Sequence, residues 1–497
     1  IRSLEVSPEF GFKLNGKKIF LQGNANHHDL GALGATCYDK AIERMMLQLK
    51  SFGYNCIRCS HNPYSDSFAR IADRVGILVV DELTDKWSDN DYWGGRQPFT
   101  HIWHKLITEW IKRDRNRPSI ILWSLGNELQ IREGWAGFEG TNDWGITTYN
   151  IFNQLVKRWD HTRLTTVAMF PARAGAITRH DKEFNDYLVP PELACATEVA
   201  SFNYQSDKYD AYLKYRPDLI LFQSEAETSN LLQPYYNMDK ERMVGIAYWG
   251  SVEYWGESNK WPKKGWNYSF FEHTMRPYPQ AYLIKTAFMP EIPEVHIGVV
   301  DAAGAESVSW NDVIVGRMAL NECWNHTPGS RRSLFTFTNA HSVELLVNGQ
   351  SMGIQKNDTT RANLRNMIYW KDVPYGNGGS VVAIARDKSG KEVARHRIET
   401  AGKAVALRIE AETPTDWKAD GMDLQYINVT VIDKKGRPVW DYNEPLTLQM
   451  EGAARLVALD NGDHYTDELF HGITSKRMYQ GRMQIILRSD QEAGNVT

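Results

Sequence analysis

The stretch NRPSIILWSLGNE, residues 116–128, decides which fold this sequence predicts. After Pro118 the chain runs through apolar residues at 120–125, interrupted only by Ser124, and then reaches Asn127 and Glu128. A short apolar run without alternation is typical of a strand buried on both faces in a parallel sheet. In a parallel barrel the reacting groups follow such strands at their C-terminal ends. Asn127 and Glu128 are therefore the first candidates for catalytic residues.

Seven similar runs share the first 290 residues with this one. They are Ile19–Gln22, Tyr54–Cys59, Ile77–Asp81, Leu164–Ala168, Val199–Asn203, Leu219–Ser224 and Val244–Trp249. Between several of them lie amphipathic stretches that end at a glycine, such as those closing at Gly53 and Gly76, which is a helix C-terminal signal. Eight strands alternating with helices over this length predict a (β/α)8 TIM barrel rather than an open sheet.

The pattern changes after Pro290. Alternating apolar and polar residues, with turn signals such as Asn348-Gly349, predict two immunoglobulin-like β-sandwiches. The fold class is thus multidomain, an α/β barrel followed by all-β domains. We expect residues 1–8 to be the end of a preceding β-sandwich, 9–290 the barrel, 291–402 a first sandwich and 403–497 a second, incomplete one. The opening strand and the missing Met suggest a piece of a longer polypeptide.

Composition excludes several classes of protein. The 497 residues carry 57 basic and 61 acidic side chains, a net charge of −4, which offers no basic field for nucleic acid. No run approaches the ~18 apolar residues of a membrane-spanning helix. The five cysteines include one C-x-x-C, Cys56 and Cys59, without the second pair that a zinc site needs, so we expect free thiols. The 17 tryptophans are the unusual feature.

Two glutamates end opposite strands of the predicted barrel. Glu128 follows the fourth strand and Glu225 ends the seventh, DLILFQSEAETS at 218–229. A pair of carboxylates ~5–5.5 Å apart is what glycoside hydrolysis with retention requires, one group as acid/base and the other as nucleophile. Glu227 lies two residues beyond Glu225, on the same side of an extended chain, and is the second choice for nucleophile.

From about Gly11 to Ala287 the chain resembles the catalytic barrel of glycoside hydrolase family 2, the β-galactosidase group. The similar segments are GFKLNGKKIFLQGNANHHDLGALGA (11–35), NCIRCSHNPYS (55–65), GILVVDEL (76–83), NRPSIILWSLGNE, SFNYQSDKY (201–209), GIAYWGSVEYWGE (245–257) and, beyond the barrel, TNAHSVELLVNGQSMG (338–353). The resemblance implies Glu128 as general acid/base and Glu225 as nucleophile. The resemblance, together with the position of residues at strand ends, indicates sugar-binding roles for Asn127, Tyr204, Trp249, His27, His28, Asp29, Arg58, His61 and Trp255.

Two departures from the family pattern affect the expected site. Many members have an arginine where this chain has Asn26. Metal-dependent relatives hold magnesium with a carboxylate-x-His step after the third strand, whereas this chain has Asp85-Lys86-Trp87. We therefore expect no metal and no cofactor, although magnesium or sodium stays open.

A β-galactosidase-like exo-enzyme is the favoured function. A β-glucuronidase or an enzyme for anionic galactans is the alternative; the N-x-K step of glucuronidases is missing, but Arg276 could hold an anion. A non-catalytic carbohydrate-binding protein is a further alternative. Expected partners are an oligo- or polysaccharide substrate, with no nucleic acid and no membrane span, and a homo-oligomer is left open. The glycan-degrading role favours a periplasmic or secreted location. Trp87, Trp123, Trp249 and Trp255, at or just beyond strand ends, are expected to offer flat faces to a pyranose.

Overall fold

The computed structural model describes residues 2–87, 98–129, 145–170, 189–229, 231–258, 260–301, 306–310 and 313–497. Within these ranges the chain forms two compact units. The first comprises residues 1–28, 49–251 and 307–315, and the second comprises 29–48, 252–306 and 316–497. The predicted domain boundaries, after residues 8, 290 and 402, do not coincide with the bounds of these units and stay a prediction.

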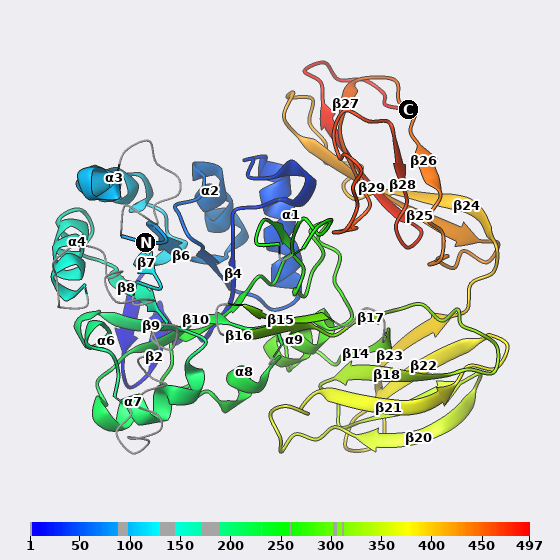
Figure 1. Ribbon diagram of the computed structural model, residues 1–497, viewed down its shortest axis with the longest axis horizontal. Coiled ribbons are helices and arrows are strands. Elements are labelled where there is room, and N and C mark those ends of the chain that lie inside the picture. Colours follow the sequence, from blue (N-terminus) through cyan, green and yellow to red (C-terminus); the bar gives the residue numbers. More distant parts are fainter. Residues whose placement is uncertain are drawn as a thin grey trace. The chain divides into compact units, whose positions relative to one another are not determined.

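Eight parallel strands of the first unit close into a barrel, which confirms the predicted fold class (Figure 1). Their order around the ring is β4-β5-β6-β7-β8-β9-β10-β11, with β11 pairing back to β4. The strands are β4 (Leu21–Asn26), β5 (Cys56–Cys59), β6 (Leu78–Glu82), β7 (Ile120–Asn127), β8 (Leu164–Met169), β9 (Val199–Asn203), β10 (Leu221–Ala226) and β11 (Gly245–Trp249).

Each of the eight apolar runs forms a barrel strand; most strand bounds differ from the prediction by a residue or two, and two strands run further. The first run was expected at Ile19–Gln22, whereas β4 continues to Asn26. β7 likewise continues through Asn127. Polar residues at these ends stay in the ladder because the barrel supplies partners: Asn24 Oδ1, for example, accepts the backbone N–H of Ser251 at 3.2 Å. Their side chains thus become part of the barrel mouth.

Helices connect the strands where the sequence predicts them. Ser65 caps α2 by accepting the N–H of Phe68, and Gly76 ends it in the left-handed conformation at φ 76°, where glycine carries no Cβ penalty. The helices described are α1 (Asp39–Ser51), α2 (Asp66–Val75), α3 (Phe99–Asp114), α4 (Ile146–Trp159), α6 (Glu192–Ala196), α7 (Tyr209–Tyr215), α8 (Gln233–Asn237) and α9 (Ala281–Phe288), with 3-10 turns at Gly31–Leu33 and Ser206–Lys208. α3, α4 and α6 lie outside the ring of strands (Figure 1).

A small antiparallel sheet precedes the barrel strands. β1 (Leu4–Ser7) pairs with β2 (Gly11–Leu14), which pairs with β3 (Lys17–Lys18). A turn at Asn15 and Gly16 joins β2 to β3, and both residues have positive φ, 51° and 74°. Asn-Gly suits such a two-residue hairpin turn because both residues tolerate that conformation.

The second unit contains the β-rich part of the chain. One four-stranded sheet has the order β17-β14-β18-β21 and another the order β20-β19-β22-β23. Buried residues of both sheets, among them Leu334, Trp370, Val343 and Ala383, form one hydrophobic core, which is the predicted sandwich arrangement. These strands are β14 (Val295–Val300), β17 (Leu320–Asn321), β18 (Arg331–Thr338), β19 (Ser342–Val347), β20 (Gln350–Lys356), β21 (Met367–Pro374), β22 (Ser380–Arg386) and β23 (Glu392–Glu399).

The C-terminal strands build a second core around Val429, Leu459 and Ile485. The sheet order is β24-β25-β29-β27, with a separate pair β26-β28. These strands are β24 (Ala404–Ala411), β25 (Leu424–Asp433), β26 (Pro445–Thr447), β27 (Ala454–Asp460), β28 (Ser475–Arg477) and β29 (Arg482–Ser489). Short pairs complete the structure: β12 (Tyr254–Trp255) with β13 (Gly265–Trp266), and β15 (Glu306–Trp310) with β16 (Val313–Arg317).

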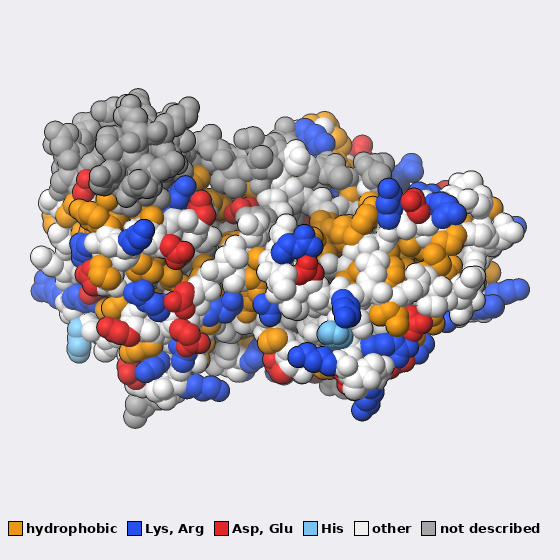
Figure 2. Space-filling view, turned by 90° about the horizontal axis from the view of Figure 1, so that it is seen from below, with side chains coloured by type: hydrophobic (Ala, Val, Ile, Leu, Met, Phe, Trp, Pro, Cys, Tyr) orange, Lys and Arg blue, Asp and Glu red, His pale blue; other side chains and the backbone are white. Residues whose placement is uncertain are grey.

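Positive and negative side chains alternate on the face drawn in Figure 2, with apolar side chains between them. That mixture agrees with the balanced composition and shows no broad basic surface on this face. Among the described residues, no helix has both the length and the apolar character needed to cross a bilayer.

Candidate functional site

Polar and charged side chains gather at the C-terminal ends of the barrel strands, where they are almost completely buried. Glu128 is 5% exposed, Glu225 is 3% exposed, and Arg58 and Glu82 are fully buried. Buried charges persist only when they are paired and hydrogen-bonded, so the contacts among these residues define the site.

Arg58, near the end of β5, connects three other strands. Its Nε and Nη2 donate to Glu82 Oε2 at 3.0 and 2.7 Å, and its Nη1 donates to Glu225 Oε1 at 2.7 Å. Nη2 also donates to Asn127 Oδ1 at 2.9 Å. The guanidinium thus fixes β6, β7 and β10 relative to one another at the mouth of the barrel.

Glu82, at the end of β6, is the second anchor of this network. It accepts hydrogen bonds from Ser124 at 2.7 Å and from His61 Nδ1 at 2.7 Å. Burial alone would raise the pKa of Glu82, but the charge of Arg58 and the hydrogen bond from His61 outweigh it and hold the pKa below its usual value. The hydrogen bond and the negative charge of Glu82 in turn raise the pKa of His61, against the effect of burial.

Both oxygens of Glu225 are held by donors. Oε1 accepts from Arg58 and lies 3.9 Å from His61 Nε2, while Oε2 accepts the hydroxyl of Tyr204 at 2.6 Å. Tyr204 follows β9 with φ 58°, and its backbone N–H donates to the carbonyl of Glu225 at 2.9 Å. The Arg58 and Tyr204 contacts described here fall on Glu225, the first choice for nucleophile.

Glu128 leaves β7 in an uncommon backbone conformation, with φ 51°. Its N–H donates to the carbonyl of Ala168 at 2.6 Å, and its Oε1 accepts from Asn203 Nδ2 at 3.2 Å. Asn203 Nδ2 also donates to Asn127 Oδ1 at 3.0 Å, and Asn203 Oδ1 accepts the hydroxyl of Ser224 at 2.7 Å. Asn203 therefore links the Asn127–Glu128 pair to the strand that carries Glu225.

Lys86 is the middle residue of Asp85-Lys86-Trp87, the segment in which Trp87 stands at the histidine position of magnesium-dependent relatives. Lys86 Nζ donates to Asp85 Oδ1 at 2.7 Å and to the carbonyl of Asn127 at 3.1 Å, and Asn127 Nδ2 donates to the same Asp85 oxygen at 3.0 Å. Burial would raise the pKa of Asp85, but the charges of His61 and Lys86 hold it at about 2. The segment that carries Asn127 and Glu128 is thus supported by an internal cation.

Three rings form an aromatic wall beside the carboxylates. His61 stacks on Trp249 with centroids 5.2 Å apart and planes 9° from parallel, and His27 meets both rings edge-on at 5.5 and 5.0 Å. His27 Nδ1 is 3.2 Å from the carbonyl of Ser60. His28 stacks on Tyr64 at 4.6 Å, and burial lowers its pKa.

Two predicted binding residues belong to the second unit. Asp29 Oδ2 accepts the backbone N–H of Trp255 at 3.2 Å, and the Trp255 indole donates to the carbonyl of Gly31 at 2.6 Å. The Trp255 ring packs against His273 and His464, with centroids 4.5 and 4.9 Å away. The structure brings these two residues together with each other; their predicted role in binding sugar stays a prediction.

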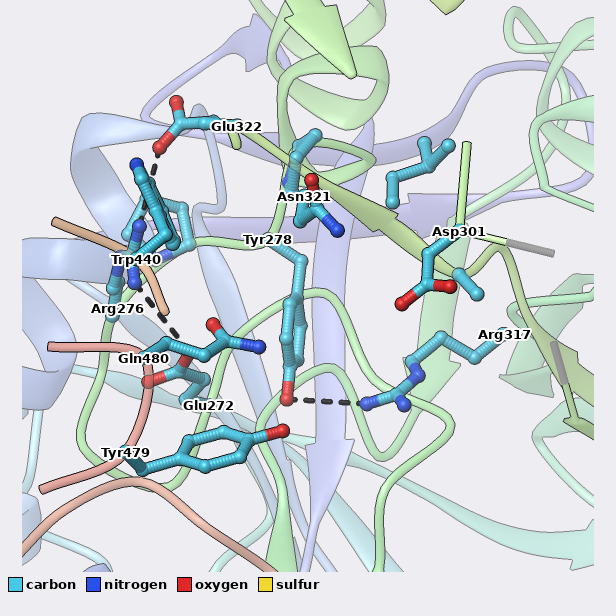
Figure 3. A pocket seen from close by; sticks show the side chains of 14 residues that line it. Glu272, Arg276, Tyr278, Asp301, Arg317, Asn321, Glu322, Trp440, Tyr479 and Gln480 are labelled. Atoms are coloured by element: carbon cyan, nitrogen blue, oxygen red, sulfur yellow. Dashed lines mark hydrogen bonds and ion pairs between the residues drawn. The ribbon is translucent and has the colours of Figure 1, made fainter. Parts of the chain in front are cut away.

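Arg276, the residue considered for an anion, also lies in the second unit. Its Nη2 donates to Glu322 at 3.2 Å and its guanidinium lies over the Trp440 ring at 4.7 Å (Figure 3). An arginine already paired with a carboxylate is a weaker anion receptor than a bare one.

The expectation that Trp87 and Trp123 present faces to a sugar is wrong. Both are fully buried. Ser124 points to Glu82 inside the barrel, so Trp123, one residue earlier, points outward, where its indole donates to Asp160. Trp87 donates to the carbonyl of Leu125 at 2.8 Å. These indoles hold the barrel together instead.

Three site residues received no role from the sequence: Glu82, Asn203 and Lys86. Glu82 and Asn203 each end an apolar run, and that position was the available signal. Lys86 was noted only as the middle residue of a step that lacks its histidine, although a lysine next to an aspartate can itself act as the local cation.

Comparisons with known proteins agree on one family. The model for the TIM barrel domain of glycosyl hydrolases family 2 matches residues 9–244, and the model for C-terminal domain 5 of glycoside hydrolase family 2 matches 407–497. Residues 329–394 match a domain of unknown function.

Relatives are found among named enzymes and solved structures. The β-galactosidase BoGH2A of Bacteroides ovatus is 27% identical, and the match covers 99% of this chain and 61% of that protein. A putative β-glucuronidase of Formosa agariphila is 44% identical over 131 residues, 26% of this chain and 12% of that protein. A crystal structure of a family 2 member from Bacteroides cellulosilyticus matches with a TM-score of 0.86 and 28% identity, covering all of this chain and 62% of the other.

The chain spans about three fifths of the length of the Bacteroides ovatus protein and of the Bacteroides cellulosilyticus structure. With the closed parallel barrel, the buried carboxylate site and two matching domain models, the chain belongs to glycoside hydrolase family 2.

Proposed function

We propose that this protein is a retaining exo-β-glycosidase that hydrolyses terminal β-D-galactosides. The observation that carries the proposal is the arrangement of Glu225, held by Arg58 and Tyr204, in the same buried network as Glu128. Such a pair of carboxylates fits double displacement, in which one group attacks and the other transfers protons.

In the first step Glu225 attacks the anomeric carbon while Glu128 protonates the departing oxygen. Hydrogen bonds to both of its oxygens fix the orientation of the Glu225 carboxylate for the attack. Asn127, held by Arg58 and Asn203, is placed to bind the sugar 2-hydroxyl. A contact of that kind strengthens as the transition state forms.

In the second step Glu128 takes a proton from water, and the resulting hydroxide displaces Glu225 from the sugar. Attachment to the sugar removes the negative charge of Glu225, so Glu128 can stay ionised and act as the base in this step. The sugar leaves with its original anomeric configuration. Trp249, stacked on His61, offers an apolar wall to the C–H face of the pyranose.

The choice of galactose rests on the matches along the chain. The relative that matches over 99% of this chain is named a β-galactosidase. A second candidate is a β-glucuronide, since the 44%-identical match over 131 residues is to a putative β-glucuronidase, and a Streptococcus agalactiae β-glucuronidase matches 150 residues at 35%.

No divalent ion is proposed for this reaction. Lys86 brings a positive charge to Asp85 and to the Asn127 carbonyl, and this supports an all-protein site. We expect that adding magnesium to metal-free protein leaves kcat unchanged.

A panel of aryl β-glycosides tests the proposal on the wild-type protein. We expect the β-galactoside to be cleaved with the highest kcat/KM, and NMR of the first product to show the β-anomer. Preference for the β-glucuronide would establish the second candidate. Absence of cleavage on every substrate, together with measurable sugar binding, would indicate a carbohydrate-binding protein.

Three glutamine variants then test the assigned carboxylates. Glu225→Gln and Glu128→Gln should each lower kcat/KM by about 10³-fold or more, because each removes a group that acts only in the transition state. Glu227→Gln is the matched control and should retain activity within a few-fold. Loss of activity in Glu227→Gln but not in Glu225→Gln would reverse the assignment of nucleophile.

A further inference from the structure

Three buried residues of the second unit converge on one point. Glu253, His273 and His464 each offer one ligand atom, and these atoms lie within 4.8 Å of one another. The exposed fractions of the three residues are 1%, 4% and 4%. Glu253 and His273 flank the short β12–β13 pair in sequence, whereas His464 follows β27 in the C-terminal part of the chain.

The spacing of these atoms suits a metal ion. Glu253 Oε2 lies 3.1 Å from His273 Nδ1 and 3.3 Å from His464 Nε2. Nitrogen and carboxylate ligands of zinc sit at about 2.0–2.1 Å in tetrahedral geometry, which puts neighbouring ligand atoms about 3.3 Å apart. Both separations from Glu253 Oε2 are therefore already near those that a shared ion would impose.

The other polar atoms of the ligands have partners that leave the converging atoms available. His273 Nε2 lies 2.9 Å from Asp460 Oδ1. A ligating histidine usually donates its second N–H to a carboxylate in this way. Glu253 Oε1 accepts the hydroxyl of Tyr278 at 2.7 Å and lies 3.9 Å from Arg317, so the arginine faces the oxygen that turns away from the imidazoles.

His464 provides the second, independent observation. Neither of its ring nitrogens has a hydrogen-bond partner among the described residues, although the ring is buried. Its 3.3 Å approach to Glu253 lacks the geometry of a hydrogen bond.

We propose that Glu253 Oε2, His273 Nδ1 and His464 Nε2 bind one Zn²⁺ or a similar divalent transition metal. Without metal, Asp460 and Glu253 hold a proton on each side of His273 and raise its pKa, against the effect of burial. Metal binding replaces the Nδ1 proton, which goes to solvent. The ion joins the segment behind the last barrel strand to the C-terminal β-domain, and its role is structural.

A pocket adjoins the side chains that hold Glu253. Tyr278 and Arg317, which face Glu253 Oε1, both line the pocket of Figure 3, and Arg317 Nη1 donates to the Tyr278 hydroxyl at 3.3 Å. Its volume is about 130 Å³.

A second histidine cluster, His296, Glu322 and His396, is the contrasting case. His396 Nδ1 accepts the backbone N–H of Ile297 at 3.0 Å, which places the proton of the neutral ring on Nε2, the nitrogen that faces Glu322. To bind a metal through Nε2, a neutral His396 would have to move its proton to Nδ1 and lose the hydrogen bond from Ile297, whereas His273 can keep a proton on the Nε2 that faces Asp460. His396 is therefore a suitable control.

Zinc titration of metal-free wild-type protein, followed by calorimetry and by metal analysis after dialysis, tests the proposal. We expect about one ion per chain. His464→Gln should weaken binding more than 100-fold, and Asp460→Asn, which removes a supporting carboxylate, should weaken it 10- to 100-fold. His396→Gln and His341→Ala should bind as wild type does.

Zinc binding no tighter in wild type than in His464→Gln would overturn the proposal. Circular dichroism in EDTA checks that each variant is folded. If a variant does not fold, the visible spectrum of cobalt-loaded wild-type protein supplies the answer: a tetrahedral spectrum supports the site, and an octahedral aqua-ion spectrum contradicts it. Both measurements are independent of glycoside hydrolysis, so the two proposals stand or fall separately.

Discussion

Lys86 contacts the backbone next to Glu128 and can therefore influence the proposed chemistry by positioning that residue. Its ammonium bonds both the Asp85 carboxylate and the Asn127 carbonyl, one residue before Glu128. Those bonds fix the point at which the chain leaves β7. A positioning role of this kind should affect turnover more than substrate affinity.

Replacing Lys86 by methionine keeps the length of the side chain and removes the charge. We expect kcat on the preferred aryl glycoside to fall by about 10- to 100-fold with KM changed little, because small displacements of catalytic groups are costly. The pKa of Asp85 should rise once Lys86 no longer lowers it. Steady-state kinetics and NMR titration measure the two effects.

Lys105→Met, at an exposed position of α3, is the control and should leave both quantities unchanged. A Lys86 variant with wild-type kcat would show that the acid/base segment needs no internal cation.

At the scale of single elements, close packing of neighbouring strands limits which residues the barrel accepts. Gly245 in β11 pairs with Leu21 in β4, and a Cβ at Gly245 would lie 2.4 Å from both the Cβ and the carbonyl oxygen of Leu21. Because backbone atoms cannot move aside, the two strands would have to separate.

Gly245→Ala should therefore lower the free energy of unfolding by about 3 kcal/mol, as overpacking does. Gly16→Ala is the comparison, because it adds the same methyl group in open space at φ 74° and should cost only about 1 kcal/mol of backbone strain. Urea denaturation followed by circular dichroism measures both. Equal losses would mean that the barrel relaxes around the new Cβ.

The first sandwich should lose stability in mild acid because of one strand residue. Burial in β23 and the nearby His296 lower the pKa of His396 to about 3, while Glu322 acts in the opposite direction. The unfolded chain, with an ordinary histidine pKa near 6.5, binds a proton between pH 6.5 and 3 that the folded domain does not bind. Stability therefore falls as the pH drops through this window.

From pH 7 to pH 5 this single group should remove about 2 kcal/mol from the free energy of unfolding. Amide hydrogen exchange of β14, whose Ile297 N–H donates to His396, measures the loss locally. In His396→Gln the same change of pH should have a correspondingly smaller effect. An unchanged pH dependence in that variant would assign the acid sensitivity to other groups.

For the molecule as a whole, the sequence predicts the barrel well because parallel strands buried on both faces leave continuous apolar runs. All eight runs appear as strands. Side-chain direction was harder to predict: Trp123 and Ser124 are neighbours, yet one packs outward on Asp160 and the other inward on Glu82. Only the pairing of the strands decides which side chains point into the barrel and which point outward.

The candidate site was predictable to the extent that its residues end strands. Glu128 and Glu225 were found from position alone, whereas Asn203 was not, because a single asparagine at a strand end resembles an ordinary turn residue. The three-residue cluster Glu253, His273 and His464 could not be found in the same way, since about 190 residues separate His273 from His464 along the chain and only folding brings them together.

The way in which Arg58 and Tyr204 grip Glu225 has a consequence for variants that lack this carboxylate. In Glu225→Ala, a guanidinium and a phenol would face an empty space, which makes the damaged site a receptor for small anions. Added formate or azide should enter that space and restore cleavage of an activated aryl glycoside, with azide yielding the α-glycosyl azide detectable by NMR. In the wild type, Glu128 Oε1 accepts from the neutral amide of Asn203. Glu128→Ala keeps Glu225 in place, so the same anions should not form the α-glycosyl product in that variant.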